Sequence, residues 1–194
     1  MRDSELLAYI SNKLTHETPV RLTADYSCLD KRQQPDMDTI WAWTGKGIVE
    51  MEGTEAMIKE FDRASPGVRE KLMVQYLRLN KLKPSPGALP NQCAFNEVAF
   101  NEPPTTRDGN DVRYYFSEFK NLMFPGGLRQ ESDFHDVMHM SIHYLFARDI
   151  FLTKNPKHFP ANRLQQRFDD LAILTPDEFV ELFNRVLSTI KGQG

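Results

Sequence analysis

Residues 132–145 read Ser-Asp-Phe-His-Asp-Val-Met-His-Met-Ser-Ile-His-Tyr-Leu and contain three of the five histidines of the chain. His135, His139 and His143 are four residues apart, a spacing that places them along one side of a helix. No formally charged side chain occurs at 137–147, so this helix is apolar on almost every side. A helix of this kind is typically the buried centre of a helical domain. We therefore expect these residues to form the central helix of the fold.

The buried ring nitrogens of these three histidines, here called the histidine stripe, need partners. Each buried nitrogen without a hydrogen bond costs roughly 1–3 kcal/mol. A metal, a network of carboxylates and hydroxyls, or a bound substrate would each supply the partners. The residues alone leave these explanations open, because histidines of a hydrogen-bonded core or of a pH-sensitive cluster have the same spacing.

Apolar residues recur at helical spacing through most of the chain. The pattern predicts further helices, which include residues 4–14, 54–64, 66–82, 114–124, 162–173 and 176–191. Only residues 20–22 favour a short extended piece. The clearest helix start is Thr175-Pro176-Asp177-Glu178, which combines a capping box with proline at the first helical position. We predict an all-α fold, in which residues 1–194 form one domain, a bundle of six or seven helices around the histidine helix.

Residues 83–111 differ from the rest, because five prolines and two glycines make a regular helix improbable there. A connection of this length is commonly a functional loop. It contains a short repeat, Ala-Phe-Asn-Glu, at 94–97 and again at 99–102. Either the phenylalanines of the repeat anchor a long loop to the core, or one of its glutamates reaches the histidine stripe and the loop is a lid.

Composition narrows the class of protein. The 24 basic and 27 acidic residues offer no broad basic surface to nucleic-acid phosphates, so we expect no nucleic-acid partner. Cys28 and Cys93 form neither a CxxC pair nor a disulfide framework, as expected of two reduced thiols. The charged N-terminus lacks the apolar region of a signal peptide, and no run of about 20 apolar residues predicts a membrane span. We expect a cytoplasmic protein.

Two histidines one turn apart on a helix can bind one cation, because their rings project from the same face. His135 and His139 have this spacing and are candidate metal ligands, with Asp136 as a further ligand or as an acceptor that orients an imidazole. Asp136 and His143 are the candidate catalytic residues. Nitrogen and carboxylate ligands together favour a divalent first-row metal, Zn, Fe or Mn, over Ca. The candidates for another ligand are Glu97, Glu102, Glu118, Glu131, Asp149 and His158.

The segment His-Asp-Val-Met-His at 135–139 resembles the HDxxH motif of the coenzyme Q biosynthesis scaffold family. That resemblance implies an all-helical, metal-binding protein that organises lipid-quinone synthesis, although Phe151 stands where the family has a later carboxylate. The same five residues are similar to the metal-binding His-Asp pair of HD-type phosphohydrolases, with Asp169 or Asp170 as the later carboxylate. Residues 131–137 also resemble the iron-binding segment of aromatic amino-acid hydroxylases.

These observations lead to a first hypothesis, a metal-dependent hydrolase or oxygenase that acts on a small, partly apolar substrate. The alternative is a non-catalytic scaffold protein that binds a hydrophobic ligand or a partner and has structural histidines. A third hypothesis is an interaction protein that blocks the surface of a partner. The sequence contains no GxGxxG, P-loop or GxSxG motif that would point to another enzyme class.

Overall fold

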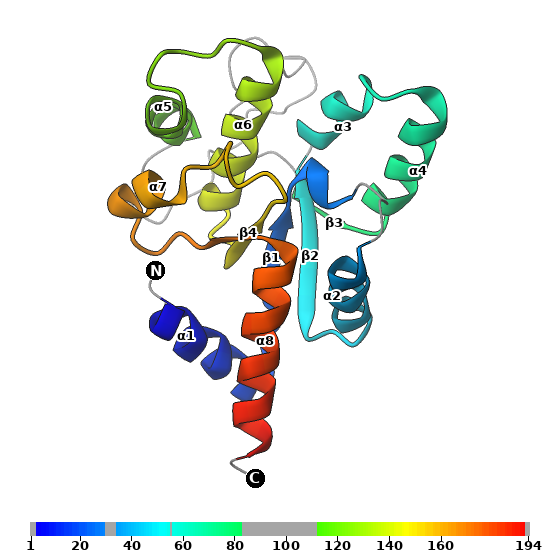
Figure 1. The fold of residues 1–194 in the computed structure, drawn as a ribbon, viewed down its shortest axis with the longest axis vertical. Coiled ribbons are helices and arrows are strands. Elements are labelled where there is room, and N and C mark those ends of the chain that lie inside the picture. The colour runs from blue at the N-terminus through cyan, green and yellow to red at the C-terminus, as the bar shows by residue number, and fades with distance from the viewer. Residues whose placement is uncertain (1–2, 30–33, 55, 83–111, 193–194) are drawn as a thin grey trace, which may run out of the picture.

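The computed structural model describes residues 3–29, 34–54, 56–82 and 112–192. They form a five-stranded parallel sheet with helices on both faces (Figure 1). The predicted all-α helical bundle is therefore wrong, and the chain is a mixed α/β protein. The loop or lid predicted at 83–111 lies outside the described residues.

The sheet has the strand order β3-β2-β1-β4-β5, and every neighbouring pair of strands is parallel. The strands are β1 (Val20–Ala24), β2 (Val49–Thr54), β3 (Asn80–Leu82), β4 (Ile150–Leu152) and β5 (Ile173–Leu174). The chain builds outward from β1 to β3 and then returns to the other side of β1 to add β4 and β5. The order therefore reverses between β1 and β4. In open parallel sheets, ligands bind in the crevice at the carboxyl ends of the strands beside such a reversal.

The helices begin close to the predicted positions, but several end earlier. α4 (Pro66–Tyr76) stops before β3, so residues 80–82 of that predicted helix form a strand. α7 (Ala161–Arg167) stops before β5, and only residue 173 of that predicted helix belongs to the strand. α8 (Pro176–Lys191) begins at the predicted capping box of Thr175 and Glu178, which is confirmed. The other helices are α1 (Asp3–Thr15), α2 (Pro35–Gly45), α3 (Ala56–Phe61), α5 (Val112–Met123), α6 (Glu131–Leu145) and a 3-10 turn at Tyr26–Cys28.

One face of the sheet is apolar and carries the larger core. Val20, Leu22 and Ala24 of β1 point to this face and are fully buried. α1, α2 and α8 contact one another or the sheet there, and Figure 1 shows them away from α5 and α6. Trp43 of α2 packs on the ring of Phe183 of α8, with the ring centroids 4.5 Å apart. Each large apolar side chain buried in this way stabilises the fold by roughly 1.5–3 kcal/mol.

The opposite face of the sheet is unusually polar. Thr23 of β1 and Thr54 of β2 point to it and are fully buried. α6 covers this face and buries all three histidines of the stripe, as the sequence predicted. Just beyond α6, Arg148 forms a close ion pair with Glu52 of β2. The second core, which includes Tyr115 and Phe119 of α5 and Leu164 of α7, fills the space around α6. Buried polar side chains are thus concentrated where the histidine helix meets the sheet.

Among the described residues, no helix combines the length and the apolar character that crossing a bilayer requires.

Candidate metal centre at the carboxyl edge

Asp25 lies at the carboxyl end of β1, beside the reversal of strand order. Its backbone N–H donates to the carbonyl of Leu152, the last residue of β4 (2.8 Å), so the two strand ends are joined there. Its carboxylate oxygen Oδ2 accepts from Ser27 Oγ (2.6 Å) and from Thr153 Oγ1 (2.9 Å). These two hydrogen bonds hold the carboxylate in a fixed orientation although it is almost fully buried. A negative charge is therefore positioned at the edge where this fold binds ligands.

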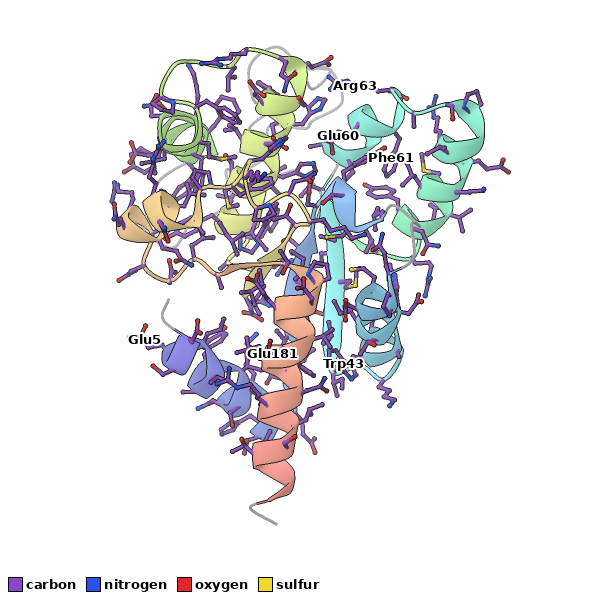
Figure 2. All side chains as sticks on the ribbon, viewed as in Figure 1. Glu5, Trp43, Glu60, Phe61, Arg63 and Glu181 are labelled. Atoms are coloured by element: carbon purple, nitrogen blue, oxygen red, sulfur yellow. The ribbon has the colours of Figure 1, made fainter. Side chains whose placement is uncertain are left out.

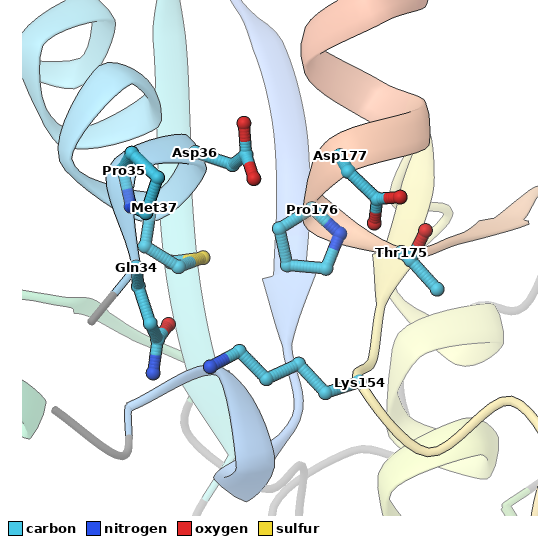
Figure 3. Close-up of a pocket in the computed structure, with 8 residues that line it drawn as sticks. All are labelled: Gln34, Pro35, Asp36, Met37, Lys154, Thr175, Pro176 and Asp177. Atoms are coloured by element: carbon cyan, nitrogen blue, oxygen red, sulfur yellow. The ribbon is translucent and has the colours of Figure 1, made fainter. Parts of the chain in front are cut away.

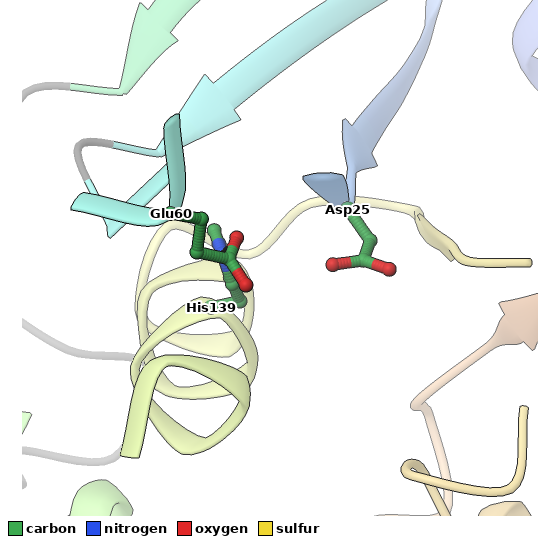
Figure 4. A group of neighbouring side chains, drawn as sticks. All are labelled: Asp25, Glu60 and His139. Atoms are coloured by element: carbon green, nitrogen blue, oxygen red, sulfur yellow. Dashed lines mark hydrogen bonds and ion pairs between the residues drawn. The ribbon is translucent and has the colours of Figure 1, made fainter. Parts of the chain in front are cut away.

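His139 lies in the middle of α6 and is bonded on both sides of its ring. Its Nδ1 is in close hydrogen-bond contact with Thr54 Oγ1, at the end of β2, and its Nε2 is 3.0 Å from Glu60 Oε2, on α3. Figure 4 shows Glu60 against the ring of His139, with Asp25 opposite them. Because a ligating histidine usually donates its other N–H to a neighbouring acceptor, Thr54 is suitably placed to direct the Nε2 lone pair toward the two carboxylates.

One ligand atom from each of Asp25, Glu60 and His139 lies within 4.8 Å of the other two. Ligand atoms about 2.1 Å from one metal and at right angles to each other are about 3.0 Å apart, which matches the spacing of Glu60 and His139. The three residues come from β1, α3 and α6, so only the folded chain brings them together. Their donor set of one nitrogen and two carboxylates fits Zn, Fe or Mn.

The electrostatics of the cluster favour a cation. Burial raises the pKa of Asp136 to about 7, and the charge of Asp25 adds to this effect, while His139 and His158 oppose it. Burial alone lowers the pKa of His139, but the hydrogen bond and the charge of Glu60 outweigh it, so the pKa is raised. The carboxylates of Asp25, Glu60 and Asp136 therefore all act on the buried imidazole of His139. A bound divalent cation would relieve their mutual repulsion.

Asp136, a predicted ligand and catalytic residue, lies next to this cluster and not within it. Its Oδ2 accepts from Nδ1 of His158 at 3.0 Å. Half of the side-chain surface of His158 is exposed, whereas Asp136 is buried. The pair therefore connects the buried site to the surface.

The other two histidines of the stripe have different surroundings. His143, a predicted catalytic residue, donates or accepts through Nδ1 at 2.9 Å from Thr23 Oγ1, and it lies outside the Asp25–Glu60–His139 group. His135, a predicted ligand, is only 1% exposed, yet neither ring nitrogen has a hydrogen-bond partner among the described residues. Burial lowers the pKa of His135, with Glu60 opposing. Of the predicted ligands that the structure describes, His139 alone belongs to the cluster.

The additional ligands proposed from sequence are also dispersed. Asp149 is at the amino end of β4, where it accepts from Tyr9 Oη and from the backbone N–H of Arg21, both at 2.7 Å. Glu118 pairs with Arg167 on the surface of α5. Glu131, at the start of α6, is largely exposed and forms a close ion pair with Arg63. Figure 2 shows Arg63 beside Glu60 near the end of α3. Glu97 and Glu102 lie outside the described residues.

A pocket opens on the same edge of the sheet, between the N-termini of α2 and α8 (Figure 3). It has about 440 Å³ of empty space, part of it open to solvent. Its lining residues are Gln34, Pro35, Asp36, Met37, Lys154, Thr175, Pro176 and Asp177. The backbone N–H of Lys154 donates to Ser27 Oγ (2.9 Å), which in turn donates to Asp25. Hydrogen bonds thus connect the wall of the pocket to the cluster.

Cys28 follows the same strand, but its position argues against a nucleophile. Burial, assisted by the charge of Asp25, raises the pKa of the thiol far above its ordinary value. The thiol also donates to the carbonyl of Leu152 (3.4 Å). Cys28 therefore stays protonated and acts as a packed core residue.

Sequence reasoning missed Asp25, Glu60 and Thr54. Asp25 carried a usable signal, since it directly follows the alternating apolar and polar residues at 20–24 that form β1. Thr54 likewise ends the alternating strand β2. Glu60 carried no distinguishing signal, because a glutamate on a short helix is ordinarily a solvated residue.

Comparison of the chain with protein-family models gives no match, and comparison with curated proteins gives none either. The resemblances at residues 131–139 therefore stay predictions from short motifs.

Proposed function

We propose that this protein is a metal-dependent enzyme in which Asp25, Glu60 and His139 bind one divalent first-row metal. The observation that carries the proposal is the convergence of these three side chains at the carboxyl edge, beside the reversal between β1 and β4. The three ligands come from separate elements, and Thr54 contacts the Nδ1 atom of His139, the ring nitrogen that does not face the carboxylates. Outer hydrogen bonds of this type are typical of metal sites.

A metal in this position supplies a Lewis acid and an activated water or O2, the chemistry of a hydrolase or an oxygenase. Asp136 and His158 provide a hydrogen-bonded carboxylate and imidazole that accept a proton near the site and pass it to solvent. Asp25 is oriented by Ser27 and Thr153, so its charge does not have to reorganise when the substrate binds.

The pocket between α2 and α8 is the proposed site for a small, partly apolar substrate. Pro35, Met37 and Pro176 offer apolar surface, while Lys154 and Gln34 offer polar contacts. Pockets that mix apolar walls with a few polar groups commonly bind small molecules. Ser27 accepts from the backbone N–H of Lys154 and donates to Asp25, so hydrogen bonds link the pocket to the proposed metal site, although none of the three ligands is among its lining residues.

One observation favours the alternative, a non-catalytic binding or scaffold protein with structural histidines. His143 and His139 each have a hydrogen-bond partner on the sheet, so neither requires a metal to be satisfied. In this alternative, the polar face is a hydrogen-bonded core, and the pocket binds a ligand without chemistry.

Calorimetric titration of untagged, chelator-treated protein with Zn²⁺ and Mn²⁺ separates the two. We expect the wild type to bind one metal per chain. Asp25→Asn and His139→Gln should each weaken metal binding by more than about 100-fold, because loss of a ligand weakens binding more than loss of a hydrogen bond to a ligand. His16→Gln, which alters an exposed histidine on the turn after α1, is the matched control and should bind normally. A folded wild type that binds no metal would support the scaffold alternative.

A further inference from the structure

His135 is the least satisfied polar side chain of the histidine stripe. It lies on α6, one turn before His139, and only 1% of its surface is exposed. Neither of its nitrogens has a hydrogen-bond partner among the described residues, whereas His139 and His143 both have partners. Leaving each nitrogen unpaired costs roughly 1–3 kcal/mol. An imidazole that is buried without hydrogen bonds is available to coordinate a bound ion or ligand.

The groups around His135 identify the kind of partner. His135 precedes His139 by one turn of α6, so the two rings project from the same side of the helix, and the charges of Glu60 and His139 both act on the ring of His135. Glu131, one turn earlier, is 3.9 Å away from Nε2, too far for a hydrogen bond, and its carboxylate is already paired with Arg63. The nearby acceptor is therefore engaged elsewhere, while the unpaired ring lies next to two of the proposed ligands.

We propose that His135 is a fourth ligand of the metal bound by Asp25, Glu60 and His139, an inference that rests on the proposed function. Histidines at i and i+4 on a helix project from one face and bind one ion. The ring of His135 is outside the group whose ligand atoms lie within 4.8 Å, so it turns toward Glu60 when the metal binds. That rotation breaks no hydrogen bond to any described residue.

His143 has the same spacing from His139 but does not qualify as a ligand. Its Nδ1 is hydrogen-bonded to Thr23, on the central strand β1, at 2.9 Å. Its ring also packs edge-on against Phe151 of β4, with the centroids 5.4 Å apart. Rotation of His143 would break a buried hydrogen bond and disturb this packing. The stripe therefore consists of two metal-binding positions followed by a structural one.

A set of two imidazoles and two carboxylates narrows the choice of metal. Four protein ligands close a tetrahedral Zn²⁺ site, which leaves no position for water or substrate. In octahedral coordination, the same four ligands leave two positions open, as a reactive Fe²⁺ or Mn²⁺ site requires. The inferred metal of the working protein is therefore Fe²⁺ or Mn²⁺ rather than Zn²⁺.

The experiment is a titration of untagged protein with Mn²⁺. Calorimetry measures the affinity, and the loss of the electron paramagnetic resonance signal of free Mn²⁺ measures how much metal is bound. We expect the wild type to bind one Mn²⁺, and His135→Ala and His135→Gln to weaken binding by at least about 10-fold. The matched control is His143→Gln, on the same helix and equally buried, which should keep wild-type affinity. Circular dichroism verifies that each variant is folded.

The outcomes are distinguishable. If the wild type binds Mn²⁺ and the His135 variants bind it equally well, His135 is not a ligand, while the proposed function stands. If the His143 variant is weakened as much as the His135 variants, the assignment is also overturned. If the wild type binds neither Mn²⁺ nor Zn²⁺, both proposals fail. If the His135 variants do not fold, nitrogen NMR of the histidines in the wild type is the deciding measurement. Addition of diamagnetic Zn²⁺ should shift the ring resonances of His135, and unshifted resonances would overturn the inference.

Discussion

Replacing Thr54 by valine separates support of the metal site from support of the fold. The substitution keeps the shape of the side chain and removes the hydroxyl that contacts Nδ1 of His139. Thr54 is fully buried, so water does not take the place of the hydroxyl. The unpaired nitrogen should lower the free energy of unfolding of the metal-free protein by about 1–3 kcal/mol. Loss of an outer hydrogen bond should also weaken metal binding by about 10–100-fold.

The chain offers a close control for this prediction. Thr23, on the adjacent strand β1, is also fully buried and contacts the Nδ1 of His143 at 2.9 Å. Thr23→Val should therefore cost a similar free energy of unfolding and leave metal affinity unchanged. Urea denaturation in the presence of a chelator measures the first quantity, and calorimetric titration measures the second. Equal metal affinities in Thr54→Val and the wild type, with both folded, would show that Thr54 does not support the metal site.

Three further predictions concern the sheet. At about pH 9, where Glu52 is ionised, Arg148→Met should lower the free energy of unfolding by about 3 kcal/mol, measured by urea denaturation, because it leaves the carboxylate of Glu52 buried without its counter-charge. Burial raises the pKa of Glu52 from 4.5 to about 7, so its stabilising contribution is present at low pH and is lost as the pH rises through 7. The unfolding free energy of the wild type should accordingly fall relative to that of Glu52→Gln between about pH 5 and pH 8, by at most about 3 kcal/mol; parallel pH profiles would contradict this. Gly53→Ala should lower the free energy of unfolding by about 1–2 kcal/mol, measured by urea denaturation, because the new Cβ would lie 2.7 Å from Cδ1 of the buried Leu79. An unchanged free energy of unfolding would show that the core adjusts to the added methyl group.

The helices were more predictable than the sheet, for a physical reason. The start of α8 is specified by its own residues, since Thr175 and Glu178 cap it whatever the rest of the chain does. A strand such as β4, only three residues long, is specified by partners more than a hundred residues away on β1. Periodicity does not distinguish so short an apolar run from buried helix. The alternation of apolar and acidic residues in β2 was a detectable signal that the all-α prediction overlooked.

The candidate site was predictable only where it lies on one element. Burial of the histidine stripe followed from the apolar sequence around it, and α6 confirms it. The partners of His139 did not follow, because Thr54 and Glu60 come from β2 and α3, and Asp25 comes from β1. Only the strand order shows that these elements meet. With the sheet known, a carboxylate directly after β1 is the residue to examine first.

We propose above that Asp25, Glu60 and His139 bind a metal at the carboxyl edge of the sheet. Anomalous X-ray diffraction at the manganese edge, from crystals grown with Mn²⁺, tests it most directly. We expect one strong anomalous peak within bonding distance of all three side chains. A structure with no peak there, or with manganese only at surface carboxylates, would contradict it.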